Sequence, residues 1–227
     1  MKLAIVIPVL NERFAIAETL AQLQPLRARG VRVLVVDGGS HDGTAERARP
    51  LVDEVVRAER GRARQMNAGA RHAGAADVLL FLHADTCLPP DADRAIADAL
   101  ARGARWGRFA AQIEGRSPLL RWVSRLMNIR SRLSGICTGD QAIFVARDFF
   151  DALGGYPEQP LMEDIEFSRR ARRRAWPAAL DSAVVTSGRR WERHGVCRTI
   201  VQMWSLRWRY WRGVDPDVLA RDYREAR

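Results

Sequence analysis

The segment that most constrains the fold is a run of five consecutive apolar residues, 78–82, that ends in His83, Ala84 and Asp85. An uninterrupted run of this length is typical of a strand buried on both faces, as in a parallel sheet covered by helices. Open α/β sheets bind ligands at the carboxyl ends of their strands. Asp85 could hold a divalent cation there, together with substrate phosphates. It could equally belong to an ordinary turn before the next helix.

Strands and helices alternate along most of the chain. This order predicts a doubly wound, mostly parallel sheet flanked by helices, with right-handed crossovers. No linker or internal repeat interrupts it, so we expect a single α/β domain. The expected strands cover Leu3–Val9 and residues 31–36, 78–82, 108–113 and 142–146, with a weaker one around Val55, and the expected helices cover residues 15–23, 62–73 and 119–133.

The charge is strongly positive and comes almost entirely from arginine. The net charge is +10, and Lys2 is the only lysine among 37 basic residues. The arginines are spread along the whole chain rather than gathered in one stripe, so we expect no nucleic-acid partner. A basic protein of this kind attracts anions such as nucleotide phosphates or acidic lipid head groups.

The cysteines and the apolar runs exclude several classes of protein. Cys87, Cys137 and Cys197 are widely spaced, so neither a disulfide framework nor a zinc site is indicated. No apolar run approaches the roughly 18 residues of a membrane span, and the first residues do not resemble a signal peptide. We therefore expect a cytoplasmic protein, with peripheral contact at the inner face of the membrane as a further option.

Two other strand ends carry acidic side chains at the same edge of the predicted sheet. Glu12 follows the first strand, and Asp37 follows the second, just before Gly38 and Gly39. Glycines let the backbone turn sharply and approach a ligand, although a plain β-to-α turn has the same composition. Neither a G-x-G-x-x-G after the first strand nor a P-loop is present, which excludes the usual dinucleotide and P-loop sites.

The segment around residues 59–70 allows two interpretations. Gly61 and Arg62 at the start of the predicted helix could bind a phosphate through backbone N–H groups and a guanidinium. Asn67 lies beside the small apolar face of that helix, where asparagine contributes little to helix stability. The alternative is an arginine-rich surface helix.

Taken together, these motifs resemble glycosyltransferase family 2. The order P-V-L-N-E, D-G-G-S, G-R-A-R-Q-M-N-A-G, F-L-H-A-D-T, G-D-Q, G-G-Y-P and L-M-E-D-I-E-F carries the resemblance over nearly the whole chain. Within the family the chain is most similar to the group described as selenodomain-associated transferase 2, or arsenosugar-biosynthesis glycosyltransferases. The resemblance implies a GT-A fold and an inverting transfer of a hexosyl-type sugar from a UDP- or GDP-sugar to an acceptor.

The resemblance also implies which residues bind the donor and a divalent cation, Mg²⁺ or Mn²⁺. His83-Ala84-Asp85 takes the place of the family's D-x-D motif, so Asp85 keeps the metal position while His83 replaces the first acid. A histidine there could ligate a softer cation, and His194 could complete the metal shell. The full expected donor site comprises Pro8, Asn11, Glu12, Asp37, Gly39, Arg62, Asn67, His83, Ala84, Asp85, Gly139 and Asp140.

The expected general base is Asp164. Glu163 and Asp164 stand in the first turn of a helical pattern, where the helix dipole keeps a carboxylate ionised. The resemblance implies that Asp164 accepts the proton of the acceptor hydroxyl. Glu166 is the nearest rival, and simple helix capping is the alternative.

Within the single domain we distinguish a nucleotide-binding half (1–90), an acceptor half (91–190) and a C-terminal helical region (191–227).

The C-terminal region carries a stripe of tryptophans. Val201, Trp204, Trp208 and Trp211 recur at helical spacing, with arginines on the far side of the helix. The stripe suits a membrane interface, but we favour the other interpretation, in which it packs on the body of the domain or on a partner subunit. The acceptor could accordingly be a small molecule or a lipid.

Two rival functions remain open at this point. A nucleotidyltransferase would also need a metal-binding carboxylate, but it would normally carry a glycine-rich, lysine-bearing loop after the first strand. A catalytically inactive sugar-nucleotide binder would explain the missing acid at position 83. The presence of Asp85 and Asp164 favours the enzyme.

Overall fold

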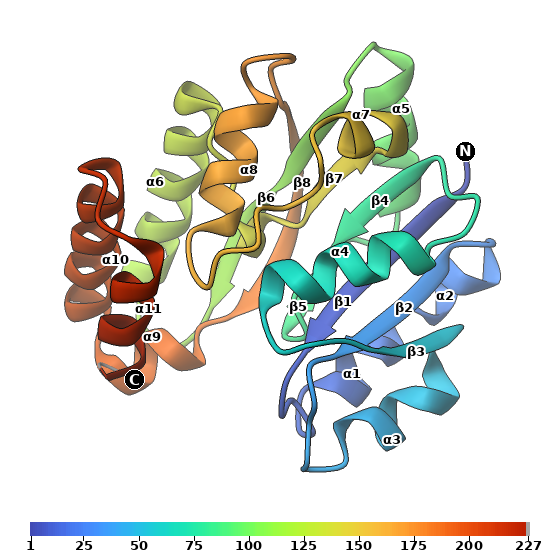
Figure 1. The fold of residues 1–227 in the computed structure, drawn as a ribbon, viewed down its shortest axis with the longest axis horizontal. Helices are drawn as coiled ribbons and strands as arrows, with labels where there is room; N and C mark the ends of the chain where they lie inside the picture. The colour runs from blue at the N-terminus through green and yellow to red at the C-terminus, as the bar shows by residue number, and fades with distance from the viewer. Residues whose placement is uncertain (226–227) are drawn as a thin grey trace.

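The computed structural model describes residues 1–225, and the side chains of all of these except residues 190, 224 and 225. One eight-stranded sheet runs through the molecule in the order β3-β2-β1-β4-β7-β6-β8-β5, and Figure 1 labels its strands. The strands are β1 (Leu3–Val9), β2 (Arg32–Asp37), β3 (Glu54–Arg57), β4 (Val78–Phe81), β5 (Thr86–Cys87), β6 (Trp106–Glu114), β7 (Ile143–Ala146) and β8 (Ala178–Ser187).

The first four strands are mutually parallel, and the direction changes beyond β4. β7 is antiparallel to both β4 and β6, whereas β8 runs parallel to β6. The chain winds from β1 outward to β3 and then returns to place β4 on the other side of β1. The carboxyl ends of β1 and β4 therefore form the switch point at which such sheets bind ligands.

Helices cover both faces of the sheet (Figure 1). The predicted helices at residues 15–23, 62–73 and 119–133 are confirmed, with bounds that differ by one residue at most at each end. They are α1 (Ile16–Gln22), α2 (Gln24–Ala28), α3 (Thr44–Ala48), α4 (Arg62–His72), α5 (Ala92–Ala101), α6 (Leu119–Ser134), α7 (Arg147–Ala152), α8 (Glu163–Ala171), α9 (Arg189–His194), α10 (Val196–Trp211) and α11 (Pro216–Glu225).

Each apolar strand faces two cores because its side chains alternate between the two faces of the sheet. In β1, Ile5 and Ile7 pack with Ile16 and Leu20 of α1. Val6 points the other way and packs with the core under α4. This double burial explains why the first strands read as continuous apolar runs.

A glycine sets how closely α4 approaches the sheet. A Cβ added at Gly69 would lie 2.3 Å from Cγ1 of Val6 and 2.9 Å from Cγ2 of Val36. Only a residue without a side chain fits there, so α4 lies directly against β1 and β2. Its first turn then reaches the carboxyl ends of these strands.

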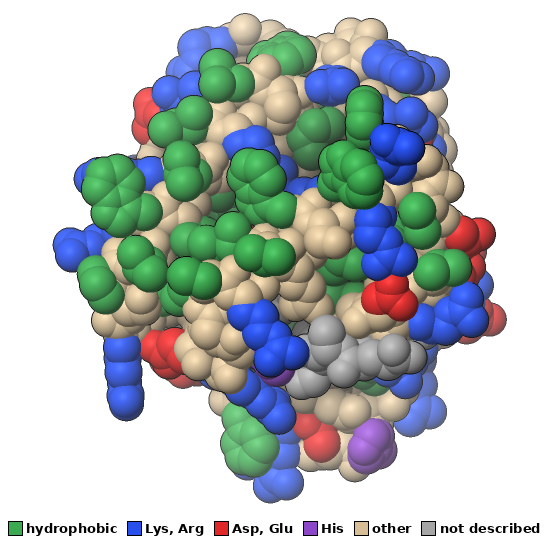
Figure 2. Space-filling view, turned by 90° about the vertical axis from the view of Figure 1, so that its left-hand side faces the viewer, with side chains coloured by type: hydrophobic (Ala, Val, Ile, Leu, Met, Phe, Trp, Pro, Cys, Tyr) green, Lys and Arg blue, Asp and Glu red, His purple; other side chains and the backbone are tan. Residues whose placement is uncertain are grey.

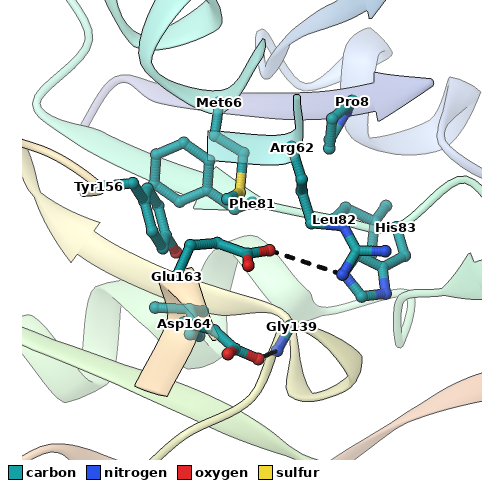
Figure 3. A pocket seen from close by; sticks show the side chains of 11 residues that line it. Pro8, Arg62, Met66, Phe81, Leu82, His83, Gly139, Tyr156, Glu163 and Asp164 are labelled. Atoms are coloured by element: carbon teal, nitrogen blue, oxygen red, sulfur yellow. Dashed lines mark hydrogen bonds and ion pairs between the residues drawn. The ribbon is translucent and has the colours of Figure 1, made fainter. Parts of the chain in front are cut away.

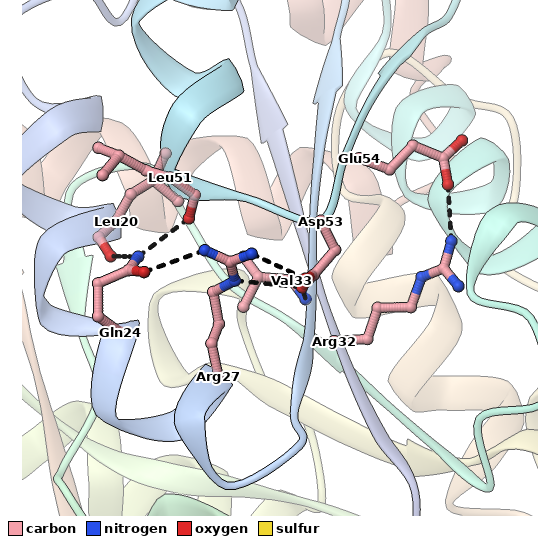
Figure 4. A network of polar contacts seen from close by, with 8 residues as sticks. All are labelled: Leu20, Gln24, Arg27, Arg32, Val33, Leu51, Asp53 and Glu54. Carbon is pink, nitrogen blue, oxygen red and sulfur yellow. Dashed lines mark hydrogen bonds and ion pairs between the residues drawn. The ribbon is translucent and has the colours of Figure 1, made fainter.

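Polar contacts fasten α2 to the outer strands (Figure 4). Arg27 donates to the Asp53 carboxylate at 2.8 Å, and the same carboxylate accepts the Val33 N–H at 2.7 Å. Burial would raise the pKa of Asp53, but the hydrogen bonds from Arg27 and Val33 lower it overall. Gln24 bridges the carbonyls of Leu20 and Leu51. The network holds the edge of the sheet far from the switch point.

The second half of the sheet packs against α6, whose inner face carries polar side chains beside the buried Leu120. Asn128 of α6 donates to the Ala111 carbonyl and accepts the Ala111 N–H, both at 2.9 Å. Ser124 accepts the N–H of Ile113 at 2.9 Å. These side chains thus take the place of a neighbouring strand along β6, and the apolar stripe of α6 points outward.

The C-terminal helices complete the structure without burying the tryptophan stripe. Trp204, Trp208 and Trp211 are 58 to 79% exposed, so the option of packing on the protein's own core is wrong. The inner face of α10 uses Leu206 instead, which clusters with Met162 and Leu219. Within the described part of the chain, no helix is both long enough and apolar enough to cross a bilayer.

Candidate functional site

A cleft of about 240 Å³ opens at the carboxyl ends of β1 and β4. Its walls come from both halves of the chain, since α8 and α10 face the strand ends across it. The sequence-predicted residues that line this cleft are Pro8, Glu12, Arg62, His83, Ala84, Asp85, Gly139, Asp140 and Asp164.

The start of α8 presents two acids. Met162 precedes the helix in a left-handed conformation (φ 66°), an uncommon geometry for a residue with a side chain. Glu163 is only 3% exposed, whereas Asp164 is partly exposed and lines the cleft. The N–H of Gly139 donates to Oδ2 of Asp164 at 3.0 Å. The carboxylate is therefore held in a fixed orientation, with oxygen lone pairs left for a further partner.

Arg62 and Glu163 connect the two halves of the chain. Nη1 of Arg62 lies 3.6 Å from Oε1 of Glu163, and Figure 3 shows the two side chains pointing toward one another from α4 and α8. Burial raises the pKa of Glu163; Arg62 opposes this effect and the neighbouring Asp164 adds to it. The Arg62 guanidinium remains half exposed in the cleft, where it can also meet an anion.

His83 packs directly on the loop that carries Gly139 and Asp140. A Cβ added at Gly139 would lie 2.3 Å from Nε2 of His83, so a larger residue there would displace the imidazole. Nδ1 of His83 lies 3.3 Å from Oδ1 of Asp140. Burial would raise the pKa of Asp140, but the hydrogen bond and charge of His83, together with Arg62 and Arg207, bring it down to about 2.

The positions of His83 and Asp85 show which of their atoms could hold a cation. Nε2 of His83 is buried and has no hydrogen-bond partner among the described residues, and Nδ1 faces Asp140, so each ring nitrogen is either buried or already paired. Asp85 lines the cleft with a carboxylate that is about one-third exposed, 3.7 Å from a guanidinium nitrogen of Arg189. Among the described residues, no three His, Cys, Asp or Glu side chains form a ligand cluster. A single carboxylate suits a cation that takes its other ligands from phosphates and water.

Five other predicted site residues do not line the cleft. Gly39 occupies a turn at φ 92°, and His194 lies at the end of α9. Asp37 is buried, and its two oxygens accept the N–H of Ser40 at 3.1 and 3.2 Å. Oδ1 of Asn11 accepts the N–H of His41. The side chains of Asp37 and Asn11 thus hold the loop that follows β2.

Asn67 holds a loop of the second half in place. Its side-chain amide donates to the Tyr156 carbonyl and accepts the Tyr156 N–H, both at 2.9 Å. A paired amide of this kind mimics a strand neighbour, which explains an asparagine on the inner side of a helix. In this structure the amide of Asn67 is therefore engaged with the backbone of Tyr156, and Asn67 does not line the cleft.

Part of the cleft wall was not foreseen from the sequence. Arg207 of α10 lines the cleft; burial lowers its pKa, and the charges of Asp164 and Asp140 oppose that shift. Thr199 and Met203 precede it at four-residue spacing and line the same wall. The four-residue spacing indicates that these three residues share one face of a helix, but the sequence did not show that this face points into the cleft.

The rival acid Glu166 is already engaged elsewhere. Arg169 donates to both of its oxygens, at 2.8 and 3.1 Å, and the Tyr210 hydroxyl donates to Oε2 at 3.3 Å. Glu166 is not among the residues that line the cleft. Of the acids in the first turn of α8, Asp164 is therefore the partly exposed one that lines the cleft and can meet a substrate.

Known proteins include a family and single relatives that are similar to this chain. The family described as Glycosyl transferase family 2 matches residues 4–147, a segment that includes the switch point but not α8. Succinoglycan biosynthesis protein ExoA from Rhizobium meliloti (strain 1021) is 34% identical over 173 residues, which are 68% of this chain and 52% of the relative. The chain thus spans about half the length of that relative.

Solved structures share the fold at low sequence identity. TarS 1–349 of S. aureus in complex with UDP-GlcNAc has a TM-score of 0.65 at 19% identity, over 82% of this chain and 58% of that chain. Mannosyltransferase PcManGT from Pyrobaculum calidifontis, in complex with GDP-Man and Mn²⁺, has a TM-score of 0.60 at 20% identity, over 81% and 56%. The fold is therefore the expected α/β, GT-A-like arrangement. With more than half of its length matched by the family, this chain belongs to glycosyl transferase family 2.

Proposed function

We propose that the protein transfers a sugar from a nucleotide-diphosphate sugar to an acceptor hydroxyl, with inversion at the anomeric carbon. The observation that carries the proposal is the position of Asp164, which a backbone N–H orients in the cleft that also holds Arg62 and Asp85. Membership of family 2 supports a glycosyltransferase. We extend this to a hexosyltransferase of the selenodomain-associated transferase 2 group, acting in the cytoplasm.

In this proposal the first half of the chain (1–90) binds the donor. Pro8 and Glu12 lie at the end of β1, and Arg62 offers its guanidinium to the diphosphate. Asp85 would hold Mg²⁺ or Mn²⁺, which would neutralise charge on the leaving diphosphate. PcManGT was solved with GDP-Man and Mn²⁺, and TarS with UDP-GlcNAc; these neighbours support a GDP- or UDP-sugar as donor.

The second half (91–190) supplies the base, and the C-terminal region (191–227) closes the acceptor side. Asp164 accepts the proton of the acceptor hydroxyl while the oxygen bonds to the anomeric carbon. The bond from that carbon to the diphosphate breaks, and its electron pair leaves with the nucleotide. Arg62 lies where it can stabilise the charge that develops on the leaving group. The acceptor is a small molecule or a lipid.

The decisive test separates binding from chemistry. Asp164→Asn keeps the shape of the side chain and removes the charge, so it should reduce nucleotide release by roughly 10²–10⁴-fold. Donor affinity, measured by calorimetry with UDP- and GDP-sugars, should stay the same. Glu166→Gln is the matched control. Normal turnover in Asp164→Asn would remove Asp164 from the proposed role.

Asp85→Asn tests the cation separately. It should weaken donor binding in the presence of Mn²⁺ to the level seen without the metal, because the proposed protein ligand is gone. If wild-type affinity proves independent of Mn²⁺ and Mg²⁺, Arg62 and Arg207 rather than a cation neutralise the diphosphate. Donor binding without any transfer in the wild type would instead indicate a sugar-nucleotide binder.

A further inference from the structure

The exposed apolar side chains are concentrated on two helices. Nine of the twelve large apolar side chains that are exposed in the described part of the chain belong to α6 and α10. Figure 2 shows hydrophobic side chains gathered on the side of the molecule where these helices lie, with arginines among them. We call these nine residues the α6/α10 face: Leu119, Trp122, Leu126, Ile129, Leu133, Val201, Trp204, Trp208 and Trp211.

The exposure of this face follows from how the helices are built. α6 uses Ser124 and Asn128 to hydrogen-bond the backbone of β6, so its apolar stripe cannot also face the sheet. α10 turns Thr199, Met203 and Arg207 toward the cleft, which leaves its tryptophans outside. Both stripes keep helical spacing, and exposed apolar side chains gathered on one side of a molecule are typical of an interaction site.

The charge of the two helices selects the partner. α6 and α10 contain no aspartate or glutamate. Of their seven arginines, Arg207 lines the cleft and the others include the exposed Arg121, Arg125 and Arg198. Arg125 lies 5.4 Å from the centre of the Trp122 ring, and Arg212 lies 5.3 Å from that of Trp208. Tryptophan and arginine in this arrangement are typical of helices that lie in a membrane interface, with the rings at head-group level and the guanidinium groups on anionic phosphates.

We propose that the α6/α10 face docks the protein on an anionic membrane surface, with both helices lying in the plane of the head groups. A second copy of the chain is a poorer occupant because it would bring two acid-free, arginine-rich faces together. Docking in this way places the cleft about one helix diameter, roughly 10 Å, from the head groups. This suits an acceptor carried by a lipid, a consequence that rests on the proposed function; the docking itself does not.

Flotation with lipid vesicles tests the proposal. The protein should float with phosphatidylglycerol-containing vesicles at low salt, should be released at high salt, and should bind pure phosphatidylcholine vesicles far more weakly. Tryptophan fluorescence should shift to shorter wavelength on binding. Failure to float with the anionic vesicles at low salt would overturn the proposal.

Two sets of variants locate the contact. Trp204→Ser combined with Trp208→Ser should reduce the vesicle partition coefficient at least about 10-fold, whereas Phe14→Ser, an exposed aromatic outside the face, should not change it. Arg121→Glu with Arg125→Glu should reduce it about 10-fold or more, against Arg71→Glu with Arg102→Glu as the control pair. Circular dichroism checks that each variant is folded.

The remaining outcomes argue against the membrane. If both sets of variants bind vesicles as the wild type does, the contact lies elsewhere and the proposal is wrong. If sedimentation equilibrium shows a dimer that the tryptophan variants dissociate, and vesicles do not compete with dimerisation, the α6/α10 face is a protein interface instead.

Discussion

The helices α4 and α6 solve the same packing problem in opposite ways. α4 turns Met66 and Ala70 onto the sheet and Arg64 and Arg71 to solvent, as an amphipathic helix normally does. α6 turns Ser124 and Asn128 onto the sheet and leaves Leu126 63% exposed. Helical spacing therefore predicts which residues share a face. It does not predict which face points inward, because a strand with unpaired N–H and C=O groups can recruit the polar side.

The largest effect should separate a buried leucine from an exposed one. Leu80→Ala removes a fully buried side chain from β4 and should lower the free energy of unfolding by about 2–5 kcal/mol. Leu126→Ala on the outer face of α6 should change it by no more than about 0.5 kcal/mol. Urea unfolding measures both. Equal losses would mean that the α6/α10 face is buried in solution, for example by a second copy.

The sequence predicted the first half of the fold well for a physical reason. Strands such as Leu3–Val9 are buried on both faces, so they appear as unbroken apolar runs. β8 was not predicted: in Ala178–Ser187, Asp181 is exposed while Leu180 and Val184 are buried. This mixed pattern carries a weaker signal than a fully apolar strand.

The second effect concerns the polar side of α6. Asn128→Ala leaves the N–H and carbonyl of Ala111 without their partner and should cost about 1–3 kcal/mol. Asn128→Leu gives α6 a more conventional inner face, yet it should be no better because leucine cannot hydrogen-bond. Ile129→Ala, one position along, is the exposed control. A more stable Asn128→Leu variant would show that packing, not hydrogen bonding, fixes the orientation of α6.

Some residues of the candidate site could be predicted from the sequence and others could not. Residues at the strand ends, such as Asp85, were predictable because the carboxyl ends of parallel strands meet at one edge. Arg207 was not, because it enters the cleft from a helix more than a hundred residues away in sequence. The contact between His83 and Asp140 could not be predicted from the sequence either, although both residues were expected in the site.

A smaller effect is expected at the edge of the sheet. Arg27→Met removes the ion pair with Asp53, whose partners are partly exposed, and should lower the free energy of unfolding by about 1 kcal/mol at most. Arg64→Met, which loses the more exposed pair with Glu59, should change it less. Thermal unfolding at low and high salt checks both. A loss in Arg27→Met as large as that in Asn128→Ala would mean that the edge network is part of the structural core.

The smallest effect should be visible only as a pH dependence at the cleft. Burial would raise the pKa of Asp140, but His83, with the charges of Arg62 and Arg207, lowers it from 3.8 to about 2, so the ionised carboxylate stabilises the folded protein at pH values above about 4. That contribution is lost as the pH falls toward about 2, where the carboxylate is protonated in the folded state as well. Solvent screens the half-exposed side chain, so the contribution is small.

Asp140→Asn should therefore lose a little stability at neutral pH, and the difference from the wild type should vanish in acid. Asp98→Asn on the exposed side of α5 is the control. A difference that persists unchanged at low pH would show that the side-chain shape, not the charge facing His83, is what matters.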